Sequence, residues 1–256
     1  MIASFELERV ARWGAAAAAI TLILTTGCNL LTDPAPTHST REPVGSATPV
    51  APDAAAVTST LRDLAGLAPD AAQKRLERLP RKLQTALRTK VQSVVKDLET
   101  AATDDERKAD FELLPPEMQG AVRLALSVAR VERSVEKVPP GRKRETRVNW
   151  FPASYGCALT AYNVWGWPLF AFHEEVLYSY SYSAVTILGM REWGACYSPM
   201  WLWVGVVDED EVDVVVFADA IARGAFVTSG FLGVNSVAFL NTRVWANGNA
   251  TFFGTI

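Results

Sequence analysis

The sequence predicts an α+β fold in which a helical segment, a small bundle or hairpin, precedes an antiparallel β-sandwich or barrel-like domain. Three observations predict this order. Apolar residues recur at helical spacing before residue 138, side chains alternate as in strands after residue 150, and the composition changes between the two halves. Seven of the eight tryptophans and all six tyrosines lie at Trp150 or beyond. The predicted segments are 1–27, 28–56, a helical module 57–138, a linker 139–149 and an aromatic-rich β domain 150–256.

The helical module contains one clear amphipathic stripe. Its apolar residues lie three and four positions apart, with Lys and Arg on the opposite face: Leu83, Leu87, Val91, Val94, Val95 and Leu98. The ten residues from Leu79 also align without a gap on the ten from Leu114, and each copy carries proline where the first turn of a helix tolerates it. Two copies are fewer than a stacked repeat array needs, so we expect a small bundle or hairpin.

The β domain contains several strand patterns. Tyrosines alternate with serines in 176–187, which predicts one strand with all the tyrosines on one face. The stretches 201–207 and 212–218 are apolar on nearly both faces and are typical of central strands, with 208–211 as the hairpin tip between them. Asn247 and Gly248 tolerate positive φ and predict a tight two-residue hairpin near the end of the chain.

Near the start of the chain, a short apolar segment ends in small residues and a cysteine. Arg9 and Arg12 precede the apolar stretch 13–24, and Thr26 and Gly27 precede Cys28. This pattern resembles the signal of a bacterial membrane lipoprotein precursor. The resemblance implies cleavage before Cys28, acylation of its thiol and attachment of the exported protein to a membrane of the cell envelope. Two acyl chains would hold it durably, since each buried methylene contributes about 0.8 kcal/mol.

An uncleaved membrane helix or plain secretion is the alternative to lipidation. The stretch 13–24 would extend about 18 Å as a helix, against about 30 Å of hydrocarbon, so it is too short to span a bilayer. The following residues, 28–56, are rich in Pro, Ala and Thr, a composition that favours an extended stalk over a packed core.

The two remaining cysteines, Cys157 and Cys196, predict a disulfide, because an exported chain meets oxidising conditions. Closing a loop of this length would stabilise the fold by about 4 kcal/mol in the loop-entropy model. The alternative is a catalytic thiol with His173 as its base, but no third residue or surrounding motif orients such a pair.

Two other patterns have both a functional and a structural interpretation. The acidic run offers oxygen ligands for calcium through Asp208, Asp210, Glu211 and Asp213, or it forms a solubilising hairpin tip that discourages edge pairing. The tyrosine row of Tyr178, Tyr180 and Tyr182 is a candidate platform for stacking on sugar rings, or it belongs to the core.

No sequence motif for catalysis or for a cofactor is present. His173 is followed by two glutamates but by Leu177 at the position where a zinc protease carries its second histidine, and Gly-x-Ser-x-Gly, phosphate-binding and dinucleotide-binding glycine patterns are missing. Acidic residues interrupt the basic ones in the helical module, which argues against a nucleic-acid partner. We therefore expect a non-catalytic, envelope-anchored lipoprotein without a cofactor, which binds the membrane through lipid and a glycan or an envelope protein through its β domain. The alternative is an envelope hydrolase acting through dispersed carboxylates or His173.

Overall fold

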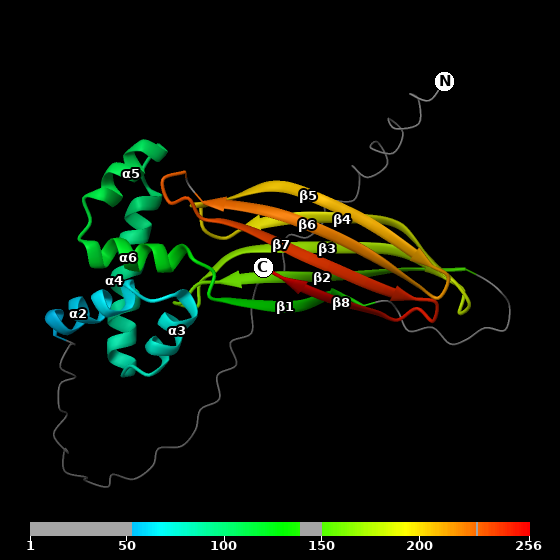
Figure 1. The fold of residues 1–256 in the computed structure, drawn as a ribbon, viewed down its shortest axis with the longest axis horizontal. Helices are drawn as coiled ribbons and strands as arrows, with labels where there is room; N and C mark the ends of the chain where they lie inside the picture. The colour runs from blue at the N-terminus through cyan, green and yellow to red at the C-terminus, as the bar shows by residue number, and fades with distance from the viewer. Residues whose placement is uncertain (1–52, 139–149, 229) are drawn as a thin grey trace, which may run out of the picture. The chain divides into compact units, whose positions relative to one another are not determined.

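The protein is a mixed α+β fold with five helices and two antiparallel four-stranded sheets in the part of the chain described here. The computed structural model describes residues 53–138, 150–228 and 230–256, all of which belong to one compact unit, 49–256. The helices, labelled in Figure 1, are α2 (Ala54–Ala65), α3 (Pro69–Glu77), α4 (Arg81–Glu99), α5 (Asp104–Glu112) and α6 (Pro116–Leu126). The strands are β1 (Arg130–Lys137), β2 (Phe151–Tyr162), β3 (Pro168–Tyr180), β4 (Val185–Cys196), β5 (Trp201–Val214), β6 (Phe217–Thr228), β7 (Asn235–Trp245) and β8 (Ala250–Thr255).

Several predicted features lie outside the described residues. These are the signal segment 1–27, the lipidated Cys28, nearly all of the stalk and the linker 139–149. The end of the predicted stalk is described, and there Asp53 caps α2 by accepting a hydrogen bond from the backbone N–H of Ala55 at 3.1 Å. Within the described ranges, no helix is long and apolar enough to cross a bilayer.

Local signals explain where the helices begin. Pro80 and Pro115 occupy the N-cap positions of α4 and α6, so each copy of the predicted repeat starts a helix. In α5, the Thr103 side chain accepts from the Glu106 N–H while the Glu106 carboxylate accepts from the Thr103 N–H, which completes a capping box.

The predicted stripe of α4 forms the helical part of the core. Leu87, Val91, Val95 and Leu98 are buried, and Leu83 and Val94 pack against them. The helical segment ends earlier than predicted, at Leu126. Residues 130–137 form β1 instead, which pairs antiparallel with β2 and extends the sheet.

Each sheet is a meander of sequential strands, ordered β1-β2-β3-β4 and β5-β6-β7-β8. The inner faces of the two sheets contact each other through aromatic rings, and the Phe170 and Phe226 rings stack with centroids 4.1 Å apart. The edge strands of the two sheets also contact each other. The Arg133 guanidinium of β1 donates to the Gly254 carbonyl of β8 at 2.7 and 3.0 Å, while the Val185 N–H of β4 donates to the Val215 carbonyl beyond β5 at 3.2 Å.

Trp203, one of two inner tryptophans of β5, fits because glycines face it. A Cβ atom added to Gly194 of β4 would lie 2.3 Å from the Trp203 ring, and one added to Gly224 of β6 would lie 2.5 Å from it. Both distances are far below van der Waals contact, so glycine at these two positions makes room for the indole.

Several strand predictions in this domain are wrong. The stretch 176–187 is not one strand, because β3 ends at Tyr180 and the chain turns through residues 181–184 before β4. The acidic residues 208–211 are not a hairpin tip, because they continue β5 in register with β6. The turn lies at Val215 and Val216, both of which are exposed, so the predicted strand 212–218 is interrupted in its middle. The stretch 201–207 lies on β5, which is an edge strand and not a central one.

The Asn-Gly turn is at its predicted position, between β7 and β8. Gly248 has φ of 85°, as a left-handed turn position requires. The turn is longer than predicted, since the Trp245 N–H donates to the Asn249 carbonyl at 2.9 Å and thereby encloses three residues.

Candidate functional site

The tyrosine row lies mainly in the core. Tyr178 and Tyr180 are 0% and 4% exposed, and the Tyr178 hydroxyl donates to the Gly248 carbonyl at 2.8 Å. Tyr182 is half-buried in the turn after β3, with φ of 62°. These rings offer no flat exposed platform, so the core-packing interpretation holds for Tyr178 and Tyr180.

The predicted disulfide between Cys157 and Cys196 is wrong, because both residues are free thiols. Cys157 on β2 pairs with Glu174, whereas Cys196 on β4 pairs with Phe170, four residues away along β3. That offset is about 13 Å along the strand, and two strand spacings add about 10 Å across the sheet. A disulfide requires Cα atoms within about 7 Å.

The alternative pair of Cys157 with His173 is not formed either. Cys157 points between the sheets, where burial raises the pKa of its thiol to about 12. His173 lies on the outer face, where its ring stacks on Trp193 at 4.9 Å and its Nδ1 lies 3.0 Å from a Glu136 carboxylate oxygen. The two side chains therefore lie on opposite faces of the same sheet.

The calcium candidates do not converge. Asp208 and Asp210 pair with residues on the outer face of β6, whereas Glu211 and Asp213 pair with Ala220 and Ala218 on its buried face. Side chains that alternate across an extended strand cannot surround one ion. In the described part of the chain, no three His, Cys, Asp or Glu side chains are arranged to hold a metal. The acidic run lies on β5, an edge strand, where charge discourages pairing with another sheet.

Two facing glutamates, the buried Glu174 and the half-buried Glu192, were not foreseen from the sequence. Glu174 and Glu192 face each other directly across β3 and β4, and each has one carboxylate oxygen, Oε1, without a hydrogen-bond partner in the described residues. The other oxygen of Glu174 accepts from the Thr242 hydroxyl of the opposite sheet and lies 3.9 Å from the Cys157 sulfur. The pKa of each glutamate is raised to about 7, mainly by burial. Nearby carboxylates add to this rise, and the hydrogen bond from Thr242 opposes it at Glu174.

This carboxylate pair is a structural feature rather than an open site. Glu174 is fully buried, so a substrate cannot reach it from solvent. Like charges directly opposite in a sheet repel each other, and protonation of one carboxylate relieves that repulsion.

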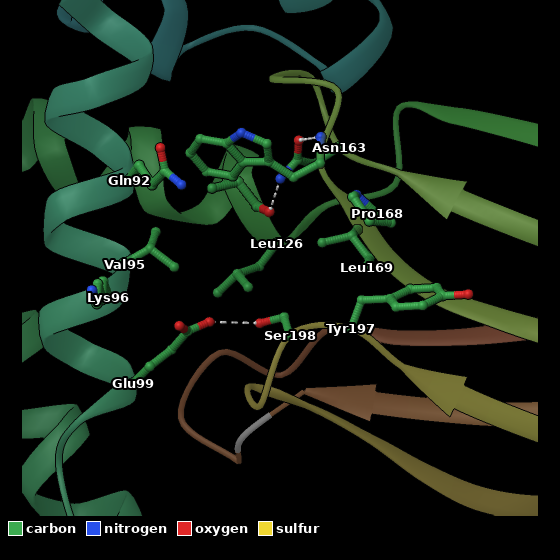
Figure 2. Close-up of a pocket in the computed structure, with 12 residues that line it drawn as sticks. Gln92, Val95, Lys96, Glu99, Leu126, Asn163, Pro168, Leu169, Tyr197 and Ser198 are labelled. Carbon is green, nitrogen blue, oxygen red and sulfur yellow. Dashed lines mark hydrogen bonds between the residues drawn. The ribbon is translucent and has the colours of Figure 1, made fainter. Parts of the chain in front are cut away.

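The candidate binding site is a pocket of about 430 Å³ where helices meet strand ends (Figure 2). Helix α4 supplies one wall, the end of α6 the second, the β2–β3 turn the third and the β4–β5 turn the fourth. The residues lining it are Gln92, Val95, Lys96, Glu99, Ala125, Leu126, Asn163, Trp167, Pro168, Leu169, Tyr197 and Ser198. Pockets of this volume, with apolar walls and a few convergent polar groups, are typical of small-molecule sites.

Asn163 builds the β2–β3 side of the pocket. Its side chain is buried, and its amide donates to the Ala125 carbonyl at the end of α6 at 2.6 Å. Its side-chain oxygen accepts from the backbone N–H groups of Trp165 and Trp167 at 2.9 and 3.0 Å. Gly166, with φ of 76°, completes the turn. One residue thus shapes the turn that carries both indoles and joins it to the helices.

The opposite end of the pocket is closed by a hydrogen bond between α4 and the β4–β5 turn. The Ser198 hydroxyl donates to a Glu99 carboxylate oxygen at 3.0 Å, as Figure 2 shows. The same Ser198 oxygen accepts from the Met200 N–H at 3.3 Å. Tyr197 is 53% exposed, and its backbone N–H donates to the Leu169 carbonyl.

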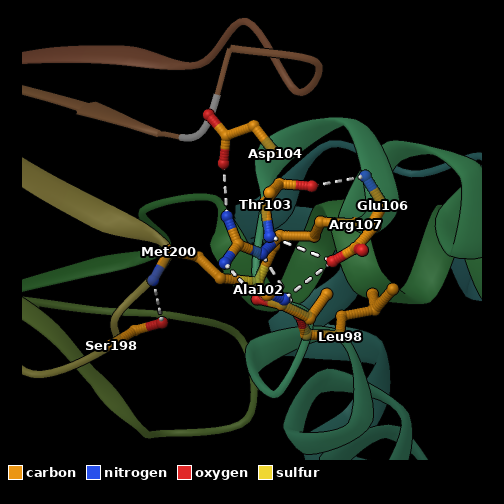
Figure 3. A network of polar contacts seen from close by, with 9 residues as sticks. Leu98, Ala102, Thr103, Asp104, Glu106, Arg107, Ser198 and Met200 are labelled. Carbon is orange, nitrogen blue, oxygen red and sulfur yellow. Dashed lines mark hydrogen bonds and ion pairs between the residues drawn. The ribbon is translucent and has the colours of Figure 1, made fainter.

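The C-terminal end of α4, which positions Glu99, is itself fixed by Arg107 (Figure 3). The guanidinium donates to the carbonyls of Leu98 and Ala101 at 3.1 and 3.3 Å and forms an ion pair with Asp104. Carbonyls at a helix end have no partner within the helix, so these bonds stabilise the last turn of α4.

The pocket combines aromatic rings, an apolar floor and a polar rim. A sugar ring has an apolar face that stacks on aromatic side chains and hydroxyls that bond to polar ones, and this pocket offers both kinds of contact. None of its lining residues was predicted as a site residue, since they come from segments far apart in the sequence. No protein-family model, curated protein or solved structure matches the chain.

Proposed function

We propose that the protein is a non-catalytic, envelope-anchored lipoprotein whose compact unit binds a glycan in the pocket between α4 and the strand turns. In this proposal the helices form a small bundle and the sheets a β-sandwich, and the bundle contributes one wall of the site. The observation that carries the proposal is the convergence of Trp167, Tyr197 and the polar side chains of α4 on one cavity. The lipidation pattern at Cys28 supports anchoring to a membrane of the cell envelope.

Binding is favoured over hydrolysis by the side chains that meet in the pocket. Glycoside hydrolysis ordinarily needs two carboxyl groups on either side of the scissile bond. Among the residues that line the pocket, Glu99 is the only acid, and it accepts a hydrogen bond from Ser198. The candidates of the hydrolase alternative lie elsewhere, because His173 is on the outer face of its sheet and Glu174 is buried.

We expect Tyr197→Ala to weaken binding of oligosaccharides released from bacterial cell walls about fivefold to tenfold. The change removes an exposed ring from the rim of the pocket, and a ring contact contributes about 0.5–1.5 kcal/mol beyond its buried area. Isothermal titration of the full-length protein, extracted from membranes in detergent, measures the affinity. The mass of the same preparation reports whether Cys28 carries acyl chains.

Trp150→Ala is the matched control for this titration. Trp150 is 50% exposed, a fraction similar to the 53% of Tyr197, but it lines no part of the pocket. We expect its variant to bind like the unaltered protein. Equal loss in both variants, or none in either, would contradict binding at this pocket.

A further inference from the structure

A second, smaller pocket also borders α4. It has a volume of about 130 Å³ and is lined by Leu76, Gln84, Thr85, Arg88, Val164 and Trp165. Helix α4 contributes seven residues to the two pockets: Gln84, Thr85, Arg88, Gln92, Val95, Lys96 and Glu99. Most of them recur three and four positions apart. Such spacing places them on one face of the helix, so both pockets border the same side of α4.

The two indoles of the β2–β3 turn connect the pockets. Trp165 lines the smaller pocket and Trp167 the larger one, and their rings stack with centroids 6.3 Å apart and planes 30° apart. The Arg88 guanidinium lies 5.8 Å from the centre of the Trp167 ring. The two indoles therefore link the pockets, with Trp165 buried and Trp167 half-buried.

Helix α4 is positively charged as a whole, in contrast to the complete chain, and two of its cations, Arg88 and Lys96, line the pockets. The net charge of the chain is −3, yet α4 carries five basic and two acidic residues. Arg88 and Lys96 make no ion pair within the described residues and lie about 12 Å apart along the helix. Glu99, the one acid lining either pocket, already accepts from Ser198.

We propose that the two pockets act as one groove that binds an extended glycan bearing carboxylate groups, held by Arg88 and Lys96. This inference rests on the proposed function and adds the charge and the length of the ligand. Opposite charges favour such a ligand, and arginine in particular matches the two oxygens of a carboxylate. The half-buried Trp167 ring, which lines the larger pocket, supports a sugar between the two charged groups.

The test compares two preparations of the same wall oligosaccharides, one untreated and one with its carboxylates converted to methyl esters. The full-length protein in detergent should bind the untreated sugars about tenfold more tightly at low salt, because two exposed charge pairs contribute about 1 kcal/mol each at most. The difference should shrink as salt is added. In the Arg88→Gln/Lys96→Gln variant, we expect both preparations to bind equally.

Lys74→Gln/Lys90→Gln is the matched control, since it also removes two positive charges but from residues that line neither pocket. This control should preserve the preference for untreated sugars. Equal binding of both preparations to the unaltered protein would overturn the charged groove while leaving glycan binding intact. The charged groove would also be overturned if Arg88→Gln/Lys96→Gln and Lys74→Gln/Lys90→Gln had the same effect on binding. Failure of both preparations to bind would overturn the proposed function as well.

Discussion

Replacing Glu174 with glutamine should stabilise the protein by up to about 3 kcal/mol at pH 8 and have little effect at pH 4. The pKa of Glu174 is about 7 in the fold, against an ordinary value of 4.5. At pH values between 4.5 and about 7, the folded state binds more protons than the unfolded state. The free energy of unfolding therefore falls as pH rises through this range. Above pH 7 the full cost of a buried charge is present, and the neutral amide of glutamine avoids it.

Urea unfolding at a series of pH values measures this effect, with Glu175→Gln as control. Glu175 is the next residue but lies on the outer face, where it pairs with Lys137. An exposed ion pair contributes about 0–1 kcal/mol, so the control should lose a little stability. Its free energy of unfolding should fall with pH as steeply as that of the unaltered protein. If the free energy of unfolding of Glu174→Gln fell just as steeply with pH, the two glutamates would not govern the pH dependence of stability.

Asn163→Ala should lower the free energy of unfolding by about 2–4 kcal/mol. The variant leaves the Ala125 carbonyl and the N–H groups of Trp165 and Trp167 without their partner, and each unsatisfied buried group costs about 1–3 kcal/mol. Because the same bonds shape the pocket, glycan affinity should fall with stability. Urea unfolding and titration at a temperature where the variant is folded separate the two effects.

Asn241→Ala serves as the comparison for this substitution. The Asn241 side chain makes no hydrogen bond within the described residues and lies half-buried on β7. We expect a change within about 0.5 kcal/mol. A similar small change in Asn163→Ala would show that the turn does not depend on its side-chain bonds.

The helices were predictable because their determinants are local. The stripe of α4 follows from the spacing of Leu87, Val91 and Val95, and the prolines at 80 and 115 mark the helix starts. Such signals act within a few residues, so the sequence alone reveals them. The change to strand at Arg130 was missed because β1 is mostly exposed and lacks an apolar alternation.

The strand errors have a different cause. Residues 208–211 are acidic and typical of a turn, but they lie in β5 because pairing with β6 outweighs their low strand propensity. The prediction of a disulfide was wrong for a related reason. Both cysteines lie near β3 in the sheet, and only the register, which no local pattern specifies, shows how far apart they are.

Only some of the structural elements around the pocket could be predicted from the sequence. An asparagine and a glycine around Trp165 signal a turn, yet nothing local shows that the turn bonds to the end of α6. The facing glutamates, 174 and 192, were likewise hidden until the register of β3 and β4 was known. Both features depend on contacts between residues far apart in the chain.

Hydrogen–deuterium exchange of the full-length protein, with and without untreated wall oligosaccharides, locates the ligand directly. If the glycan occupies the groove, exchange should slow in α4 and in residues 163–168 and stay unchanged in β7 and β8, which line neither pocket. Saturating sugar that left α4 and the turn unchanged, or that slowed only β7 and β8, would contradict a binding site at this junction.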